Sequence, residues 1–355
     1  AKKNFGVTKW VGDTFYIPVR TQRFPGVIAL PDGEALLHGE PVYQQAAAAV
    51  KLLTGSFEID KKTLSVKDAG SVVPLLTRMS EDLTNDLIMD INRQLFGTGD
   101  GVLGTASADG TGTTLTMKAS LNGDITAEDV ITPGQYINVG NTTANKVVAV
   151  SGNTITLTTS STWSSGDSIT KATATGTAAD EITGLGELFD NSKTYLGINP
   201  TTYPVWKAVV DGDSSTTVAL SLADMHKNYA AANKVGEVKY VFLNKTLFQK
   251  YGSALETNVR FEPKSVLGGG WKGLDYMAGQ AEVVLDYNTP DDWVTMLSPK
   301  MLTIGELQPL QFEQGTEGKL LRKAGYMNYE VVMAGLMELA SFARAAHACL
   351  KGRVA

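Results

Sequence analysis

The stretch that decides the fold is VVPLLTRMSEDLTNDLIMDINRQLFGTGDGVLGTA, residues 72–106. Pro74 is tolerated in the first turn of a helix, and Gly97 follows the last apolar residue as a stop signal. Between them, apolar side chains recur at three- and four-residue spacing, which is typical of one helix face: Leu76, Met79, Leu83, Leu87, Ile91 and Leu95. The sequence therefore predicts a long helix over residues 72–96.

An acidic row follows the other side of this helix, where Asp82, Asp86 and Asp90 stand at every fourth position. Like charges at this spacing destabilise an isolated helix by about 0.2–0.5 kcal/mol per pair. Two interpretations stay open. The row is either a solvated face, the commoner role of a charge run, or a surface that meets something basic.

The glycine run that follows the helix, Gly97 to Gly104, invites a nucleotide-binding interpretation. The third glycine of a dinucleotide fingerprint would fall at Val102, however, and the run follows a helix instead of preceding one. We therefore expect a glycine hinge between two elements.

Residues 104–180 are rich in Thr, Ser, Gly and Asn, and short alternating segments are separated by turn residues such as Pro133-Gly134 and Gly152-Asn153. This spacing is typical of a small sandwich or barrel, and it favours a folded inserted all-β domain over low complexity. The expected strands are Thr113–Thr116, Tyr136–Val139, Lys146–Val150 and Thr154–Thr158.

Residues 1–70 contain many breakers and little sustained periodicity. Within them, Gln44–Ala49 has high helix propensity, while Phe57–Ile59 and Leu64–Val66 alternate like short strands around a turn at Asp60–Lys62. We expect an extended arm followed by a long excursion. Because such a segment cannot bury its own apolar residues, it is expected to find its partners elsewhere.

The second half of the chain has a mixed α/β pattern. Helices are expected over Val218–Ala232 and Lys245–Tyr251, with a buried strand at Tyr240–Leu243 between them. Three further strands and a longer one are expected at Ala281–Asp286, Trp293–Leu297, Leu302–Ile304 and Leu320–Val332. The stretch from Met337 to Gly352 fits a strand or a helix, and both stay open.

The composition describes a folded chain of two or three domains. It has 355 residues, of which 43% are hydrophobic and 19% are charged, with a net charge of −6. This charge argues against a large basic surface that grips nucleic acid. The single cysteine, Cys349, cannot form an internal disulfide. No apolar run is long enough to span a membrane, and the N-terminus does not look like a signal peptide.

Motifs that carry chemistry are missing from the sequence. His38, His226 and His347 are isolated from one another, so no metal site is expected. There is no P-loop and no nucleophile elbow, and Asp211–Ser215 only imitates the start of a calcium loop. Cys349 is expected to be a small buried residue. The sequence predicts no cofactor and no catalytic site.

The order of elements now resembles a known family. Arm, long excursion, long helix and the segment LFGTGDGVLGTA (95–106) resemble the major capsid proteins of tailed bacteriophages, which have the Hong Kong 97-type fold. In that family a spine helix commonly ends in an aliphatic-Gly-x-Gly-x-Gly segment. YVFLNKTLFQKYG (240–252), GQAEVVLDYNTPDDW (279–293) and MLSPKMLTIGEL (296–307) are similar to the strands, helix and return strands of the axial domain.

The resemblance implies an α+β chain with the Hong Kong 97-like capsid fold and an inserted all-β domain. The implied parts are an N-terminal arm (1–25), an extended loop (26–70), a peripheral domain with the spine helix (71–103, continued in 181–210 and 319–355), the inserted β domain (104–180) and an axial domain (211–318).

The same resemblance implies a function. It suggests a major capsid protein, not an enzyme, that self-assembles as hexamers and pentamers into an icosahedral shell around double-stranded DNA, without sequence-specific binding or a membrane. Scaffolding, portal and decoration proteins are the further partners implied, with assembly in the host cytoplasm and a final place in the virion capsid. The expected subunit-interface residues are Phe57, Lys61, Lys62, Asp82, Asp86, Asp90, Arg260 and Trp271.

Two alternatives remain open. An encapsulin-type compartment shares the fold and encloses a protein cargo. From another class, the β module is a carbohydrate- or surface-binding domain, although Tyr136 and Trp163 are few aromatic residues for a sugar platform.

Overall fold

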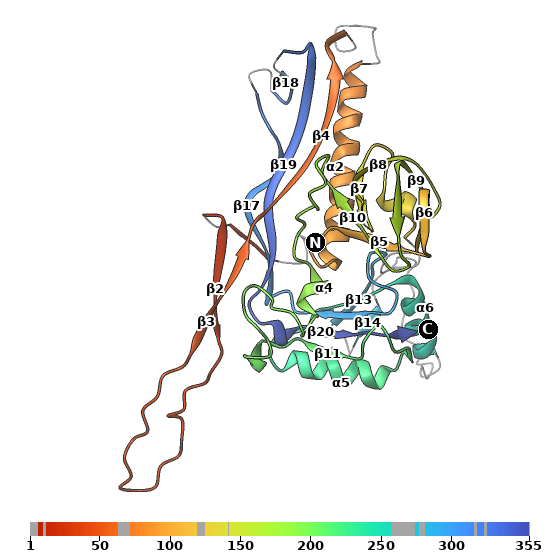
Figure 1. The fold of residues 1–355 in the computed structure, drawn as a ribbon. Coiled ribbons are helices and arrows are strands. Elements are labelled where there is room, and N and C mark those ends of the chain that lie inside the picture. The colour runs from red at the N-terminus through yellow and green to blue at the C-terminus, as the bar shows by residue number, and fades with distance from the viewer. Residues whose placement is uncertain are drawn as a thin grey trace, which may run out of the picture.

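The computed structural model describes residues 6–9, 12–62, 72–118, 125–140, 142–256, 274–276, 281–315, 318–322 and 325–354. The described chain has four visible parts: a long sheet beside one long helix, a lower sheet, a barrel and a projecting hairpin (Figure 1). Arg260, Trp271 and the strand expected at Leu64–Val66 lie outside the described residues. Within these ranges no helix has the length and apolar character needed to cross a membrane.

The long helix is α2, Val72–Phe96, as the spacing of its apolar residues predicts. It lies along a sheet in which β4 (Lys51–Asp60) runs antiparallel to β19 (Asn328–Ser341). Gly55 of β4 faces the helix, since a Cβ there would lie 2.9 Å from Leu83 Cδ1 and 3.0 Å from Leu87 Cδ1. The glycine therefore permits the close approach of helix and strand.

The long sheet is completed by strands from both ends of the chain. On the side of β19 away from β4, β17 runs antiparallel to it and pairs in turn with β1 in parallel register. A short strand, β18, pairs with the other end of β19. The bounds of these strands are Gly6–Lys9 for β1, Leu302–Phe312 for β17 and Leu321–Arg322 for β18.

The expected single strand over Leu320–Val332 is wrong. The chain forms β18, turns at Gly325, whose φ of +81° suits a glycine, and re-enters the sheet as β19. The stretch left open between strand and helix is extended: β19 continues to Ser341, a single 3₁₀ turn η2 follows at Arg344–Ala346, and β20 covers Ala348–Leu350.

The lower sheet is six-stranded and mixed, in the order β11-β20-β16-β13-β15-β14. The helices α5 (Leu222–Asn233) and α6 (Lys245–Glu256) pack against it and bury Met225, Leu247 and Tyr251. The remaining strands are β11 (Val209–Asp211), β13 (Tyr240–Leu243), β14 (Leu274–Tyr276), β15 (Ala281–Leu285) and β16 (Val294–Leu297).

The helix expected from Val218 begins later than predicted. Val218–Ala219 form β12, which pairs in parallel with β21 (Arg353–Val354). Ser221 has the extended backbone of an N-cap position, and α5 starts at Leu222. Pairing with a strand distant in sequence therefore overrides the local helical spacing.

The region predicted to be all-β closes into a barrel, in the order β10-β5-β6-β9-β8-β7. Its interior is mainly apolar, with Leu115, Ile137, Ile155 and Ile169 fully buried, and it also holds the buried Asn145, which donates to Ser161. The short helix α3 (Ala127–Val130) packs against it. The bounds of the strands are Val102–Ala106 for β5, Gly110–Lys118 for β6, Tyr136–Val139 for β7, Thr142–Ser151 for β8, Thr154–Trp163 for β9 and Ser168–Ala172 for β10.

The glycine run after α2 is only partly the expected hinge. Gly99 and Gly101 have φ of +89° and +72° and make the turn out of the helix. From Val102 the run is β5, the first strand of the barrel. The hinge is therefore limited to the first residues of the run.

Two short helices lie in the core between the long sheet and the lower sheet: α4 (Leu185–Leu188) and the 3₁₀ turn η1 (Pro204–Trp206). Buried Arg344 lies over the Tyr195 ring at 5.2 Å and donates to the carbonyl oxygens of Leu188 and Asp190 at 2.5 and 2.7 Å. These contacts hold the segment after α4 in place. The base of the projecting hairpin packs against that segment at Leu196.

Candidate assembly interface

The projecting hairpin consists of β2 (Thr14–Arg20) and β3 (Tyr43–Ala49), paired antiparallel from Thr14 opposite Ala49 to Arg20 opposite Tyr43. Its base joins the body, where the backbone N–H of Ala47 donates to the carbonyl of Leu196 at 2.9 Å. Beyond Arg20 the chain leaves the body altogether (Figure 1).

The helix propensity of Gln44–Ala49 does not decide its structure, because this segment is strand β3. Ala46 and Ala48 are fully buried, and they lie on the same face of the ribbon as the buried Ile17 and Val19 of β2. The small side chains on the buried face let the strand pack closely on the body. Tertiary pairing therefore overrides the local preference for a helix.

The connection between the two strands, which we call the projecting loop (residues 21–42), contains no helix or strand. Its two arms run close together, because a Cβ at Gly26 would lie 2.4 Å from the carbonyl oxygen of Leu37, and one at Gly39 would lie 2.1 Å from Pro25 Cγ. The two glycines therefore let the two segments of the loop lie in contact with each other. At the root of the loop, the N–H of Thr21 donates to the Val42 carbonyl at 2.8 Å.

The projecting loop exposes large apolar side chains along its whole length. Val27 is 85% exposed and Leu36 is 71% exposed. The others are Phe24, Ile28, Leu30, Leu37 and Val42. A contiguous exposed apolar segment of this kind marks an interaction surface, since a long loop inside a compact domain is usually functional. These side chains lie outside the apolar cores that the described residues form.

The expected interface residues around Phe57 lie away from this loop. Phe57 is half-buried in β4, opposite Val331 of β19, and not in a projecting excursion. Lys61 and Lys62 are exposed just beyond the end of β4, where the N–H of Lys61 donates to the Met327 carbonyl at 3.1 Å. Within the range 26–70 expected for the extended loop, residues 51–60 therefore form strand β4 of the long sheet.

The acidic row of α2 divides into two parts. Asp82 and Asp86 are exposed, next to the exposed apolar side chains of Ile88 and Met89. Asp90 is partly buried and meets basic groups within the chain: Arg93 Nη2 at 2.9 Å and Lys171 Nζ at 3.0 Å.

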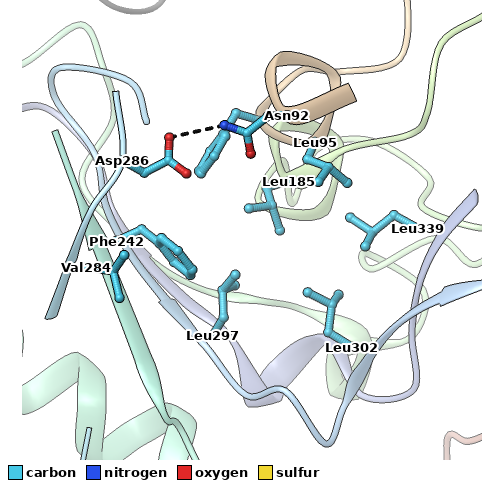
Figure 2. A pocket seen from close by; sticks show the side chains of 10 residues that line it. Asn92, Leu95, Leu185, Phe242, Val284, Asp286, Leu297, Leu302 and Leu339 are labelled. Carbon is cyan, nitrogen blue, oxygen red and sulfur yellow. Dashed lines mark hydrogen bonds between the residues drawn. The ribbon is translucent and has the colours of Figure 1, made fainter. Parts of the chain in front are cut away.

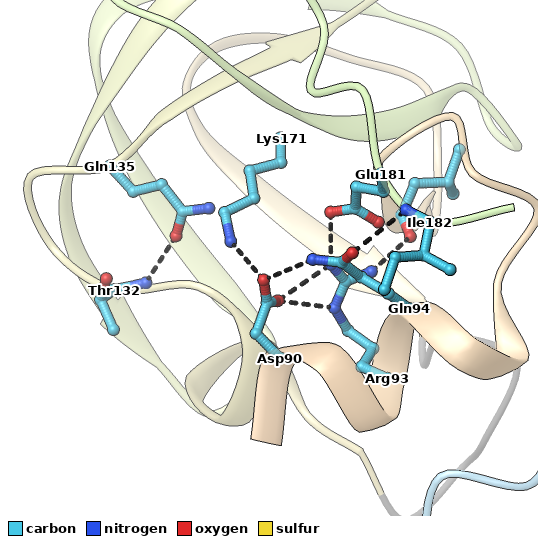
Figure 3. A network of polar contacts seen from close by, with 9 residues as sticks. Asp90, Arg93, Gln94, Thr132, Gln135, Lys171, Glu181 and Ile182 are labelled. Carbon is cyan, nitrogen blue, oxygen red and sulfur yellow. Dashed lines mark hydrogen bonds and ion pairs between the residues drawn. The ribbon is translucent and has the colours of Figure 1, made fainter. Parts of the chain in front are cut away.

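Asp90 belongs to a polar network that attaches the barrel to α2 (Figure 3). Arg93 Nη2 reaches Glu181 Oε1 at 2.5 Å, and Gln94 Nε2 donates to Asp90 Oδ2 at 2.8 Å. Burial alone would raise the pKa of Asp90, but Arg93 and Lys171 outweigh it and hold the pKa below its usual value. Burial dominates at Glu181, whose pKa is raised although Arg93 opposes the shift. Lys171 lies on β10, so the network connects the last strand of the barrel to the helix.

Ser341 and His347 form a buried pair that resembles a nucleophile and a base, with Oγ 3.1 Å from Nε2. The backbone N–H of Ser298 donates to Nδ1 of His347 at 3.2 Å, so the neutral ring carries its proton on Nε2. Burial lowers the pKa of His347 to about 4 and keeps the ring neutral. The ring therefore donates to Ser341 and is not placed to take its proton.

Metal-ligating side chains do not cluster in the part of the chain that the structure describes. No group of three or more His, Cys, Asp and Glu residues there is arranged to hold a metal ion. Cys349 is fully buried, and burial raises the pKa of its thiol to about 12. The arrangement offers surfaces for contact, among them the projecting loop.

Comparison with known proteins places the fold. No protein-family model and no curated protein sequence matches the chain. A chain of the capsid asymmetric unit of cyanophage A-1(L) matches 98% of this chain and 90% of its own length, with a TM-score of 0.58 and 14% identity. A chain from the capsid of a native GTA particle matches 99% and 89%, with a TM-score of 0.53 and 11% identity.

A chain from the capsid of an empty GTA particle is similar over the same shares, with a TM-score of 0.51. These likenesses define the class of fold: α2 as the spine, the long sheet, the lower sheet and the projecting hairpin make a Hong Kong 97-type capsid fold. The α+β fold expected from the sequence is confirmed.

The sequence contains a signal for an interface in the projecting loop, where none of the expected interface residues lies. Apolar pairs, Val27-Ile28 and Leu36-Leu37, stand among prolines and glycines in a segment without periodicity. Apolar residues that no helix or strand can turn inward are candidates for an interface.

Proposed function

We propose that this chain is a structural subunit, a major capsid protein, that self-assembles as hexamers and pentamers into an icosahedral shell around double-stranded DNA. The observation that carries this proposal is the projecting loop, whose apolar side chains such as Val27 and Leu36 lie outside the cores formed by the described residues. The capsid fold supports it, since the similar chains are parts of capsids.

The parts of the chain then have distinct roles. The long sheet and α2 form the peripheral domain, the lower sheet forms the axial domain, and residues 102–172 form an inserted barrel. The extended loop of the subunit is the β2–β3 hairpin with its connection, residues 14–49, and not the longer range expected from the sequence. Residues 26–49 are common to both ranges.

Two contacts with neighbouring subunits are proposed, and the first joins the acidic face of α2 to the basic root of the projecting loop. Asp82 and Asp86 on α2 are exposed, as are Arg20 and Arg23 at the root of the projecting loop. Opposite charges on two surfaces of one chain suit a contact between copies and fix its register. Phe57, Lys61 and Lys62 form a second proposed contact at the far end of the long sheet, and Asp90 is proposed to act within the subunit.

Around the axial domain, Arg260 and Trp271 stay proposed contacts. The role is structural and not catalytic, and the orientation of the Ser341–His347 pair supports this. A net charge of −6 suits a wall that must release a packed polyanion. Scaffolding, portal and decoration proteins are the further proposed partners, with assembly in the host cytoplasm and a final place in the virion capsid.

Assembly is the direct test. The protein is expressed alone, purified at moderate salt and examined by negative-stain electron microscopy and light scattering. Closed particles formed by the isolated protein would support a shell-forming subunit. Particles assembled in the host that protect double-stranded DNA from nuclease would support the capsid role. Particles that enclose only protein would favour an encapsulin-type compartment, and a monomer at every concentration that binds glycans would overturn the capsid role.

The role of the projecting loop is tested with the double variant Val27→Ser, Ile28→Ser. Both side chains are exposed, so the subunit should fold normally while particle yield falls at least tenfold. Glu34→Gln, an exposed polar change in the same loop, is the matched control and should assemble like the unmodified protein. Normal particles from the double variant would contradict the proposed contact.

A further inference from the structure

A cavity of about 130 Å³ lies on the seam between α2 and the lower sheet and is partly open to the surface. Its wall comes from both sides of the seam: Leu95 of α2 and Leu339 of β19 face Phe242 of β13 and Leu297 of β16. Figure 2 shows these side chains arranged around an open centre. The cavity therefore touches both sheets of the molecule at once.

The polar groups of the wall are gathered at one edge (Figure 2). There Asn92 Nδ2 donates to Asp286 Oδ1 at 3.4 Å, and the same oxygen accepts from the N–H of Asn288 at 2.8 Å. A buried water needs two to four polar partners, and the rest of the wall is apolar. The centre of the cavity therefore suits an apolar occupant better than water.

The size of the cavity also points to an occupant. Protein interiors rarely leave voids larger than a water molecule, because the atoms around a void lose their dispersion contacts. Dry apolar cavities of about 150 Å³ bind benzene or xenon. One wall residue, Phe242, already meets Phe96 edge to face with centroids 6.3 Å apart, which is how a bound ring could meet it too.

We propose that the seam cavity is a binding site for a small, uncharged, apolar molecule of about the size of benzene. The occupant contacts α2 and β19 on one side and the lower sheet on the other. Binding therefore stabilises the docking of the two sheets by mass action. This site is separate from the projecting loop, and it does not depend on whether the chain forms shells.

Thermal unfolding of the full chain in the presence of benzene tests the proposal. The unfolding temperature should rise with the logarithm of the benzene concentration. Benzoate has the same ring with a negative charge that the apolar wall cannot compensate, so it should give a clearly smaller rise. No rise with benzene, or an equal rise with benzoate, would overturn the proposal.

A filling variant locates the binding. Val284→Phe places a ring at the wall of the cavity and should abolish the benzene-dependent rise. The matched control is Val148→Phe on the barrel, where the valine is 55% exposed, and it should keep the rise. A rise that persists in Val284→Phe would show that benzene binds elsewhere.

Because a phenylalanine at 284 can overpack the wall, a second measurement uses the unmodified chain. The ¹²⁹Xe resonance should shift saturably with protein concentration, and benzene should reverse the shift by displacing xenon from the cavity. A xenon shift that benzene leaves unchanged would overturn the proposal even if the filling variant does not fold.

Discussion

In the barrel, Leu115, Ile137 and Ile155 are fully enclosed by strands that hydrogen-bond around a closed circle. In the projecting loop, Val27 and Leu36 are 85% and 71% exposed, on a segment without helix or strand. Both regions extend from the same body, and they differ in what buries their apolar residues. The barrel forms its own apolar core, whereas the apolar side chains of the loop lie outside the cores of the described residues. Whether a region needs a partner therefore depends on where its apolar side chains lie, and not on how many it has.

The largest expected effect is at the centre of the barrel. Ile155→Ala removes a fully buried side chain and leaves a cavity, which should lower the free energy of unfolding of the barrel by about 2–5 kcal/mol. Urea denaturation and hydrogen exchange of the barrel strands measure the loss. Ser160→Ala, on the exposed side of the same strand, should change stability by less than about 0.5 kcal/mol. Equal effects at the two positions would mean that the barrel does not have a core of its own.

A second expected effect lies at the joint between the barrel and the body. Arg93→Ala leaves the buried Glu181 and the partly buried Asp90 near one described cation, Lys171, and should cost about 3–5 kcal/mol of stability. Hydrogen exchange at Ile182, whose N–H donates to Gln94 in the same network, should rise as the joint loosens.

Lys171→Ala is the matched control for this joint. The Lys171 side chain is 34% exposed, so solvent screens its contact with Asp90 and the loss should stay below about 1 kcal/mol. A barrel that stays fixed to α2 in Arg93→Ala would show that packing, and not the ion network, orients it.

The comparison of regions also shows what the sequence could predict. Helix 72–96 was predictable because its apolar spacing is local and continuous. Strand β3 was not, because Gln44–Ala49 prefers a helix locally and only its pairing with β2 makes it extended. In the barrel, β5 and β10 were missed since one begins in a glycine run and the other is short and polar.

The candidate interface was predictable only in part, for a related reason. Exposure is a property of the whole fold. The sequence predicts a short strand at Phe57 but not its pairing with β19, which half-buries the side chain. The acidic row of α2 was visible in sequence, but which of its members meets a cation depended on where the barrel packs. Asp90 has such a partner in Lys171, while Asp82 and Asp86 remain exposed.

A third expected effect concerns the core at the base of the hairpin, where Glu338 is buried. Its Oε1 accepts the N–H groups of Thr183 and Leu339 at 2.8 and 2.9 Å, and the charges of Lys51 and Asp180 lie nearby. Burial raises the pKa of Glu338 from 4.5 to about 8. The unfolded chain therefore ionises this carboxyl at lower pH than the folded chain, and stability is lost as the pH rises from 4.5 to 8.

Glu338→Gln should remove that loss, because a glutamine keeps the acceptor and does not ionise. The stability of the variant relative to the unmodified chain should rise by about 4 kcal/mol between pH 4.5 and pH 8. His347, whose lowered pKa weakens both proteins as the pH falls below 6.5, cancels in this difference. Denaturation curves of the two proteins at several pH values give the result. A difference that does not vary with pH would show that Glu338 is ionised in the folded chain.

The smallest expected effect on the stability of the subunit is at Leu36. This variant tests the contrast between the barrel and the projecting loop most directly. Leu36→Ser changes a side chain that is 71% exposed, so the free energy of unfolding of the monomer should move by less than about 0.5 kcal/mol. If a neighbouring subunit buries the projecting loop, the same change lowers the binding free energy of each contact by about 1.5–3 kcal/mol, because the apolar burial is lost. The concentration at which particles form, followed by light scattering, should therefore rise tenfold or more, since about 1.4 kcal/mol corresponds to a factor of ten. Asp32→Asn, a polar and exposed change in the same loop, should leave that concentration within about twofold. A Leu36→Ser chain that assembles at the original concentration would mean that the loop stays exposed in the particle, and the contrast with the barrel would then have another cause.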